Sequence, residues 1–251
     1  MDRGRKGFTV MASETFLREN LAACTRILSM QGLLGLFGHV STYQPETGRI
    51  YISPGKGSNK STMSAGELAV MDLDGKVLEG EGQVPREWPI HTALHRARPD
   101  ALAVAHIHSP YATLFAIAKR EYRPVTLQAA MFEKGIPLYT QPHLITTPAL
   151  GVEIAELIGN KRAALLQGHG TVIVGANVEE MLYATLVLED DTRKAVQASV
   201  LGELQVFSEQ ECREFESVES LQRRAQRSWN YFVMVESCWD RQPTTGINIF
   251  V

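Results

Sequence analysis

The sequence predicts a single layered α/β domain in which the last helices pack over or beside the sheet. Segments with apolar residues at helical spacing interleave with short apolar or β-branched segments along all 251 residues. Apolar residues make up 44% of the chain and charged residues 21%, which allows a sizeable buried core. No internal repeat, low-complexity tract or linker-like segment divides the chain. We therefore expect one domain over residues 1–251, with a flexible N-terminus over residues 1–12.

The N-terminal third is expected to form one helix followed by short strands. Apolar residues recur at helical spacing after Ser13, a good N-cap residue, and Gly32 marks the end of this helix. Asp74 and Gly75 between two apolar segments are typical of a hairpin turn. The expected elements are a helix over 13–32, strands near Val40 and Tyr43 and over 49–53, and a hairpin made of 69–73 and 76–78.

The remaining chain alternates helices with buried strands. A helix that begins at Glu87 must stop near Pro99, because proline disfavours the helical conformation of the residue before it. Ser208 and Glu211 have the spacing of a capping box, which predicts the start of a late helix. The expected elements are a helix over 87–98, a strand over 101–105 that runs into His106, a helix over 111–120, extended segments over 125–127 and 136–139, a helix over 151–158, strands over 163–167 and 171–174, and helices over 178–196 and from Ser208 onward.

Charge and hydropathy argue against several classes of protein. The chain has 25 Lys and Arg against 28 Asp and Glu, so it offers no broad cationic surface for a nucleic-acid backbone. No segment approaches the roughly 20 apolar residues needed to span a bilayer, and the N-terminus lacks the apolar region of a signal peptide. We expect a cytoplasmic protein with no nucleic-acid partner and no membrane partner.

Three of the seven histidines lie in two short motifs that suit a metal ion. His106 and His108 are two residues apart at the end of a buried strand, so their imidazoles point to the same side, and His169 follows another strand. Such a pair alone is only moderately specific, since it also occurs as an ordinary polar strand end. Apolar neighbours favour a metal, because an unpartnered imidazole at the edge of a core is costly. Three imidazoles leave a position open for substrate, so we expect one catalytic Zn²⁺, Mn²⁺ or Fe²⁺ per chain.

A carboxylate opens the helix that precedes the paired histidines. Glu87 and His91 are four residues apart, so both side chains face one side of that helix. Glu87 is a candidate acid/base residue, and His91 is a candidate substrate contact. The alternative for Glu87 is a glutamate that only interacts favourably with the helix dipole.

In their order along the chain, these motifs resemble those of the class II aldolase and adducin family, from about Leu17 to about Val196. Five matches in the family's own order are hard to obtain by chance. The matching segments are Gly38-His39-Val40-Ser41, Ile52-Ser53-Pro54-Gly55, Glu87-Trp88-x-x-His91, Arg98-Pro99-Asp100 ahead of His106-Ile107-His108, and Leu166-x-x-His169-Gly170.

The resemblance implies a three-layer α/β/α fold with a central mixed, largely antiparallel sheet. It implies a divalent ion on His106, His108 and His169, with Glu87 as a further ligand or a proton carrier. It also implies a homotetramer with active sites at the subunit contacts.

Two departures from the family's pattern bear on the substrate. Sugar-phosphate aldolases of the family carry a hydroxyl pair before the glutamate, where this chain has Pro85 and Arg86, and His39 stands in place of an asparagine. Arg86 offers a planar fork suited to a carboxylate, or it is only an exposed residue at a helix start. His39 is a catalytic acid or hydrogen-bond donor, or only a turn histidine. Ser53 and Gly55 of the turn motif complete the substrate contacts expected in this half of the chain.

These departures are closer to the family's decarboxylases of hydroxylated aromatic or heteroaromatic carboxylates. We therefore predict a metal-dependent carbon–carbon lyase that acts on a small-molecule carboxylate. Decarboxylation and retro-aldol cleavage both leave an electron pair on carbon, which a cation bound to the adjacent oxygen stabilises. An aldolase, an Fe²⁺ oxygenase on the same fold and a non-catalytic adducin-like binding module stay open as alternatives.

An apolar and aromatic segment over residues 229–235 lies near the C-terminus. It is too apolar to be left in water, so it forms a subunit contact or packs as a helix on the core of its own chain. In the first case, Tyr231 is a candidate substrate contact in a neighbouring subunit's active site.

Overall fold

The computed structural model describes residues 13–80 and 83–239. Its centre is an eight-stranded sheet with the strand order β4-β3-β2-β1-β5-β8-β7-β6. All neighbouring strands are antiparallel except β6 and β7, which are parallel. The predicted three-layer α/β/α fold with a largely antiparallel sheet is confirmed. The N-terminus that we expected to be flexible lies outside the described residues.

The elements follow the predicted order along the chain. The strands are β1 (His39–Gln44), β2 (Arg49–Ile52), β3 (Ala69–Met71), β4 (Val77–Glu79), β5 (Ala103–Ile107), β6 (Leu138–Tyr139), β7 (Ala163–Leu166) and β8 (Gly170–Gly175). The helices are α1 (Glu14–Met30), α2 (Trp88–Ala97), α3 (Ala112–Ile117), α4 (Pro148–Ile158), α5 (Val178–Ala198), α6 (Glu209–Val218) and α7 (Leu221–Trp239), with short 3₁₀-helices η1 (Lys60–Thr62), η2 (Ala65–Glu67) and η3 (Leu127–Phe132). None of the described helices has the length and apolar character needed to cross a membrane.

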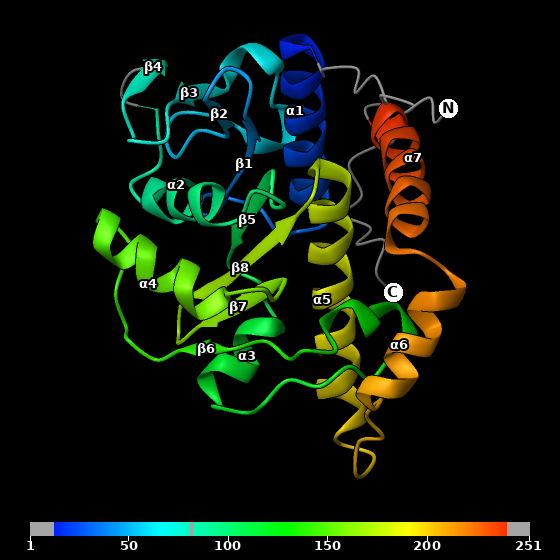
Figure 1. Ribbon diagram of the computed structural model, residues 1–251. Helices are drawn as coiled ribbons and strands as arrows, with labels where there is room; N and C mark the ends of the chain where they lie inside the picture. The colour runs from blue at the N-terminus through cyan, green and yellow to red at the C-terminus, as the bar shows by residue number, and fades with distance from the viewer. Residues whose placement is uncertain (1–12, 81–82, 240–251) are drawn as a thin grey trace, which may run out of the picture.

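Helices cover both faces of the sheet (Figure 1). On one face α2 and α4 pack against each other, and Ile90, Ile154 and Val104 belong to the same buried cluster there. On the other face α1, α3 and α5 cover the sheet, and α7 packs outside α1 and α5. Side chains alternate along a strand, so β5 points Ala105 toward α5 and both Val104 and His106 toward α2. His106, a predicted metal ligand, therefore faces α2 and α4.

The start of α1 agrees with the sequence prediction, whereas the start of α4 differs from it. Ser13 caps α1 by accepting a hydrogen bond from the Phe16 N–H at 3.2 Å, as predicted. The α4 helix begins three residues earlier than expected, because Thr147 caps it and Pro148 fits its first turn. The predicted extended segment over 125–127 is wrong at Leu127, which starts η3.

The carboxylate of Asp191 on α5 explains the error at Leu127. It accepts hydrogen bonds from the Val125 and Thr126 N–H groups at 3.3 and 2.8 Å. It also accepts one from the Tyr122 hydroxyl at 2.8 Å. The backbone N–H groups of this segment therefore pair with a helix side chain and not with a neighbouring strand.

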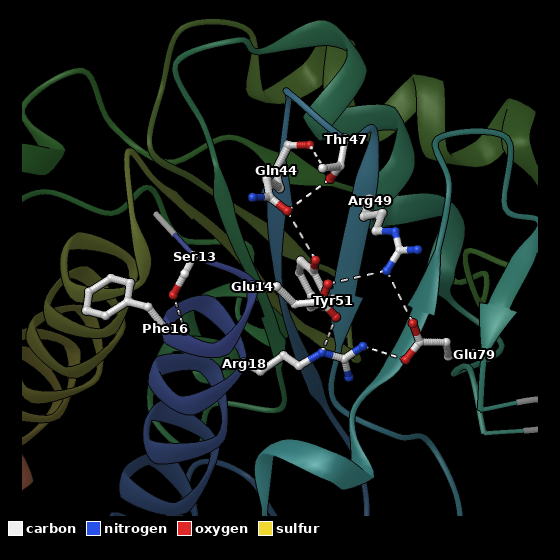
Figure 2. Close-up of polar contacts among 9 residues, drawn as sticks. All are labelled: Ser13, Glu14, Phe16, Arg18, Gln44, Thr47, Arg49, Tyr51 and Glu79. Atoms are coloured by element: carbon white, nitrogen blue, oxygen red, sulfur yellow. Dashed lines mark hydrogen bonds and ion pairs between the residues drawn. The ribbon is translucent and has the colours of Figure 1, made fainter. Parts of the chain in front are cut away.

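An ion-pair network fixes α1 against the edge of the sheet (Figure 2). Arg18 pairs with Glu14 one turn earlier at 2.8 Å and also with Glu79 of β4. Arg49 of β2 reaches Glu79 at 3.3 Å, and the Arg18 guanidinium lies 5.0 Å from the centre of the Tyr51 ring. Tyr51 belongs to the buried cluster beneath α1 and α5, so this network lies on the opposite face from His106.

The apolar segment over 229–235 is part of α7 and packs on the core of its own chain. Trp229 is buried in the cluster that α1 and α5 share. Tyr231 and Met234 are 49% and 57% exposed. Packing within the chain therefore accounts for Trp229, while Tyr231 and Met234 stay available for a contact with another subunit.

Candidate metal centre

The end of β5 and the turn before β8 bring three histidines together. His106 is the fourth residue of β5, His108 follows the strand, and His169 lies in the turn between β7 and β8. The ring centres of His106 and His169 are 4.8 Å apart, and that of His108 lies 5.3 Å from the first and 5.0 Å from the second. One possible ligand atom from each ring lies within 4.8 Å of the other two. The structure thus gathers the three predicted metal ligands at one point.

A glycine allows this close approach of β8 to β5. A Cβ atom on Gly170 would lie 2.4 Å from the carbonyl oxygen of Ile107, a distance that real Cβ atoms do not adopt. Any other residue would push the start of β8, and His169 with it, away from the end of β5. The glycine after His169 is therefore part of the site's geometry.

The histidine nitrogens fit a metal ion. His106 donates from Nδ1 to the carbonyl oxygen of Thr171 at 3.1 Å, so its Nε2 carries a lone pair when the ring is neutral. Among the described residues, the buried Nε2 of His106 and both ring nitrogens of His169 have no hydrogen-bond partner. Buried polar atoms are rarely left without a partner. A bound cation would satisfy Nε2 of His106 and one nitrogen of His169.

Glu87 completes the centre from the start of α2. Its Oε2 lies 3.4 Å from Nε2 of His106 and 3.4 Å from Nε2 of His169, longer than an ordinary hydrogen bond. Ligand atoms about 2.1 Å from a tetrahedral Zn²⁺ lie about 3.4 Å apart, so this spacing suits a shared ion. The other oxygen, Oε1, accepts a hydrogen bond from the Ile145 N–H at 2.8 Å, which orients the carboxylate.

The Glu87 carboxylate does not serve its own helix. Glu87 occupies the N-cap position of α2, yet its side chain makes no capping hydrogen bond. Burial alone would raise the pKa of Glu87, but the neighbouring His106 and His169 rings hold that pKa well below its usual range. The side chain is therefore an ionised carboxylate directed at the histidines.

His39 lies beside the centre because of strand register. It pairs with His106 across β1 and β5, and directly opposed residues of neighbouring strands point to the same face. The two ring centres are 5.1 Å apart. His39, Glu87 and His106 form a second set whose possible ligand atoms lie within 4.8 Å of one another. Burial, reinforced by the neighbouring His91 and His106, lowers the pKa of His39 well below its usual value.

His91 lies behind His39, away from open solvent. It is fully buried, and its Nε2 and Nδ1 lie 2.7 Å from Nδ1 of His39 and 2.6 Å from Oγ of Ser41. Ser41 in turn lies 2.9 Å from Nε2 of His95. Neither Ser41 nor His95 was predicted as a site residue, although Ser41 lies two residues after His39 on a strand and His95 lies four residues after His91 on a helix.

Two further residues near the centre, Lys60 and Phe37, lie outside the motifs found in the sequence. Lys60 is only 5% exposed and donates to the carbonyl oxygen of Gly38, next to His39. Burial lowers its pKa to about 8, and none of the described carboxylates forms an ion pair with it. Phe37 stacks on His108, with ring centres 5.6 Å apart, and is 65% exposed. The centre thus has a buried cation and an apolar rim.

The two residues predicted from the turn motif have clear structural roles. The buried Oγ of Ser53 accepts a hydrogen bond from the Val40 N–H at 3.0 Å, which fixes the end of β2 beside β1. A Cβ atom on Gly55 would lie 2.7 Å from Cα of Pro85. Gly55 therefore lets the loop that carries Arg86 and Glu87 pack against the turn.

Arg86 and Tyr231 are placed very differently. Arg86 is exposed immediately before Glu87, and no ion pair holds it among the described residues. Tyr231 lies on α7, which covers the opposite face of the sheet from His106 (Figure 1). Within one chain the structure does not bring Tyr231 to the centre, so its role at a neighbour's site stays a prediction.

Comparisons with known proteins identify the family. Residues 19–196 match the model of the Class II Aldolase and Adducin N-terminal domain, so the chain belongs to this family. A 3,4-dihydroxyphthalate decarboxylase of Arthrobacter keyseri is 28% identical over 197 residues, which cover 74% of this chain and 79% of the relative.

Aldolases are also similar to this chain. A 5-deoxy-D-ribulose 1-phosphate aldolase of Bacillus thuringiensis serovar kurstaki is 30% identical over 77% of this chain and 91% of its own. The L-fuculose 1-phosphate aldolase of Glaciozyma antarctica PI12 has the same fold, with a TM-score of 0.80 at 22% identity and 95% coverage of both chains. Relatives with two different reactions therefore match this chain at similar identity.

The geometry predicts that purified protein carries close to one divalent ion per chain, since three imidazoles meet at one point. His106→Ala removes one of these ligands and should lower the metal content sharply in elemental analysis. His143→Ala, which removes an exposed histidine outside the cluster, should leave the metal content unchanged. Full metal retention in both His106→Ala and His169→Ala would contradict the assignment.

Proposed function

We propose that this protein is a divalent-metal-dependent carbon–carbon lyase that decarboxylates a hydroxylated aromatic or heteroaromatic carboxylate. The observation that carries the proposal is the ionised Glu87 carboxylate set 3.4 Å from the unpartnered nitrogens of His106 and His169. Similarity to 3,4-dihydroxyphthalate decarboxylases supports the reaction. A class II aldolase is the second candidate, supported by the 30% identity to a ribulose-phosphate-type aldolase.

The metal ligands in this proposal are His106, His108 and His169, with Glu87 as a fourth ligand or an adjacent proton carrier. A divalent ion bound there supplies stabilisation of negative charge on an oxygen next to the reacting carbon. The donor set suits Zn²⁺, Mn²⁺ and Fe²⁺, so an Fe²⁺ oxygenase remains a further candidate on the same residues. The fit of these residues to an ion argues against a purely structural adducin-like module.

Glu87 is suited to carry the proton that decarboxylation requires. One oxygen of the Glu87 carboxylate lies 3.4 Å from both His106 and His169, so the carboxylate is placed to take the proton of a substrate hydroxyl as the substrate binds. The bond from the ring carbon to the carboxylate then breaks, CO₂ leaves, and its bonding electron pair stays on the ring carbon. Glu87 returns the proton to that carbon, and water supplies the proton that restores the hydroxyl after release.

The surroundings of the centre favour an anionic, ring-containing substrate. Arg86 is exposed beside Glu87 and is unpaired among the described residues, so its guanidinium is available to a carboxylate. The buried Lys60 adds positive charge next to His39 and His108. Phe37 on His108 gives the rim an apolar aromatic surface. These features fit an unphosphorylated aromatic acid.

The reaction is tested by giving metal-loaded enzyme a panel of ortho-hydroxylated aromatic carboxylates beside fuculose-, rhamnulose- and ribulose-type phosphates. We expect CO₂ from at least one aromatic acid, and a loss of roughly 10²- to 10⁴-fold in kcat for Glu87→Gln, the usual range for removing a proton carrier. Aldehyde from a sugar phosphate, without CO₂ from any acid, would replace the decarboxylase by the aldolase. Inactivity toward both groups would favour the oxygenase or the binding module.

The substrate carboxylate is expected to pair with Arg86. Arg86→Ala removes a charged hydrogen-bond donor, worth about 1.5–3 kcal/mol, so kcat/KM should fall roughly ten- to a hundredfold while metal content stays unchanged. Arg120→Ala, which removes an exposed arginine just after α3, is the matched control and should leave kcat/KM unchanged. Equal kcat/KM values for Arg86→Ala and wild-type protein would remove Arg86 from the site.

The proposal includes a cytoplasmic homotetramer in which α7 approaches a neighbour's site. Tyr231 and Met234 leave large apolar surface in water, which a subunit contact would bury. Light scattering at micromolar concentration should therefore give the mass of four chains, and Met234→Glu should lower it. Val200→Glu, which changes an apolar residue that is 84% exposed elsewhere, should not. A monomeric wild-type protein would refute the assembly.

A further inference from the structure

A continuous chain of buried hydrogen bonds runs from the metal centre into the core. Nδ1 of His39 lies 2.7 Å from Nε2 of His91, and Nδ1 of His91 lies 2.6 Å from Oγ of Ser41. Oγ of Ser41 lies 2.9 Å from Nε2 of His95, whose Nδ1 lies 3.0 Å from the carbonyl oxygen of Ala101. All four side chains are at most 5% exposed. The chain therefore has no access to solvent along its length.

These hydrogen bonds can form in series because two residues along a strand and four residues along a helix cover nearly the same distance. His39 and Ser41 are two residues apart on β1, which spans about 6.6 Å along a strand. His91 and His95 are four residues apart on α2, which spans about 6 Å along a helix. With α2 packed over β1, the four side chains interleave in the order His39, His91, Ser41, His95.

The hydrogen bond between His95 and the Ala101 carbonyl oxygen fixes the direction of all the other hydrogen bonds in the series. A carbonyl oxygen can only accept, so His95 must donate to Ala101 from Nδ1, and its Nε2 is left as an acceptor. Ser41 has one proton, which it donates to His95, so its oxygen accepts from Nδ1 of His91. Nε2 of His91 then accepts from Nδ1 of His39. Each of the four links holds one proton, and all point away from the metal centre.

We propose that Ser41, His91 and His95 are positioning residues that hold His39 with its proton on Nδ1, so that Nε2 presents a lone pair at the active site. His39 then accepts a hydrogen bond at the centre and does not donate one. Burial lowers the pKa of His91 well below its usual value and that of His95 to about 4, which agrees with one proton on each of these two rings.

This tautomer selects the kind of substrate group that His39 can meet. The Nε2 lone pair of His39 can accept from a hydroxyl group, whereas a ketone or carboxylate oxygen at the same place would face it lone pair to lone pair. Sites built to hydrogen-bond a substrate hydroxyl strongly reject analogues that lack it, because a buried polar atom is then left unpaired. This selectivity rests on the proposed function, but the tautomer itself does not.

The test is solid-state ¹⁵N NMR on zinc-loaded holoenzyme labelled at histidine, which distinguishes rings protonated at Nδ1 from rings protonated at Nε2. We expect Nδ1 protonation on His39, His91 and His95 in the wild-type protein. Ser41→Ala should release His39 from this state, while Ser41→Thr, which keeps the hydroxyl, should retain it. Nε2 protonation of His39 in wild-type holoenzyme overturns the proposal, and this measurement needs no variant to fold.

Kinetic measurements distinguish a positioning role of Ser41 from a general loss of protein stability. In Ser41→Ala, kcat should fall roughly ten- to a hundredfold, the range for residues that orient a metal site from behind, with metal content and KM unchanged. Ser41→Thr should recover kcat to within a few-fold of wild type. Equal losses in the two variants, or an unchanged tautomer in Ser41→Ala, contradict the proposal. A wild-type enzyme that shows the tautomer but no lyase activity contradicts the proposed function alone.

Discussion

The structure depends on one constraint: buried imidazole nitrogens need partners, and the protein supplies partners for some and not for others. The Nδ1 atom of His106 bonds a backbone carbonyl, while its Nε2 and both nitrogens of His169 have none among the described residues. β5 lies between β1 and β8 in the sheet. His106 of β5 therefore has His39 of β1 on one side and His169, in the turn just before β8, on the other. The Nε2 atoms of His106 and His169 meet where Glu87 brings a negative charge, and one bound cation would satisfy one nitrogen of each ring.

Deeper in the core, the buried imidazole nitrogens of two other histidines do have hydrogen-bond partners. His91 and His95 are as buried as His106, yet both of their nitrogens are hydrogen-bonded, through Ser41 and the Ala101 carbonyl. A fully satisfied polar network inside a core rigidifies its members. The proposed site therefore has two parts: histidine nitrogens that are open to an ion, and a hydrogen-bonded network behind them that we propose orients His39.

Sequence patterns predicted what depends on near neighbours along the chain. The Ser13 cap, the alternation of strands and helices, and the two histidine motifs are encoded by local spacing, and the structure contains them as expected. Features that depend on distant packing were missed. The segment before Leu127 is set by Asp191, more than sixty residues away, and the contact between Ser41 and His95 exists only once α2 lies over β1. No spacing in one segment records how it will meet another.

We propose that His106, His108 and His169 bind one divalent ion beside Glu87. Anomalous X-ray diffraction from crystals of the purified protein, recorded on both sides of the metal's absorption edge, locates such an ion directly. We expect a single strong peak per chain, with imidazole nitrogens of these three histidines about 2.0–2.1 Å away if the ion is Zn²⁺. A peak ligated by other residues, or no peak in protein that binds metal stoichiometrically, would contradict it.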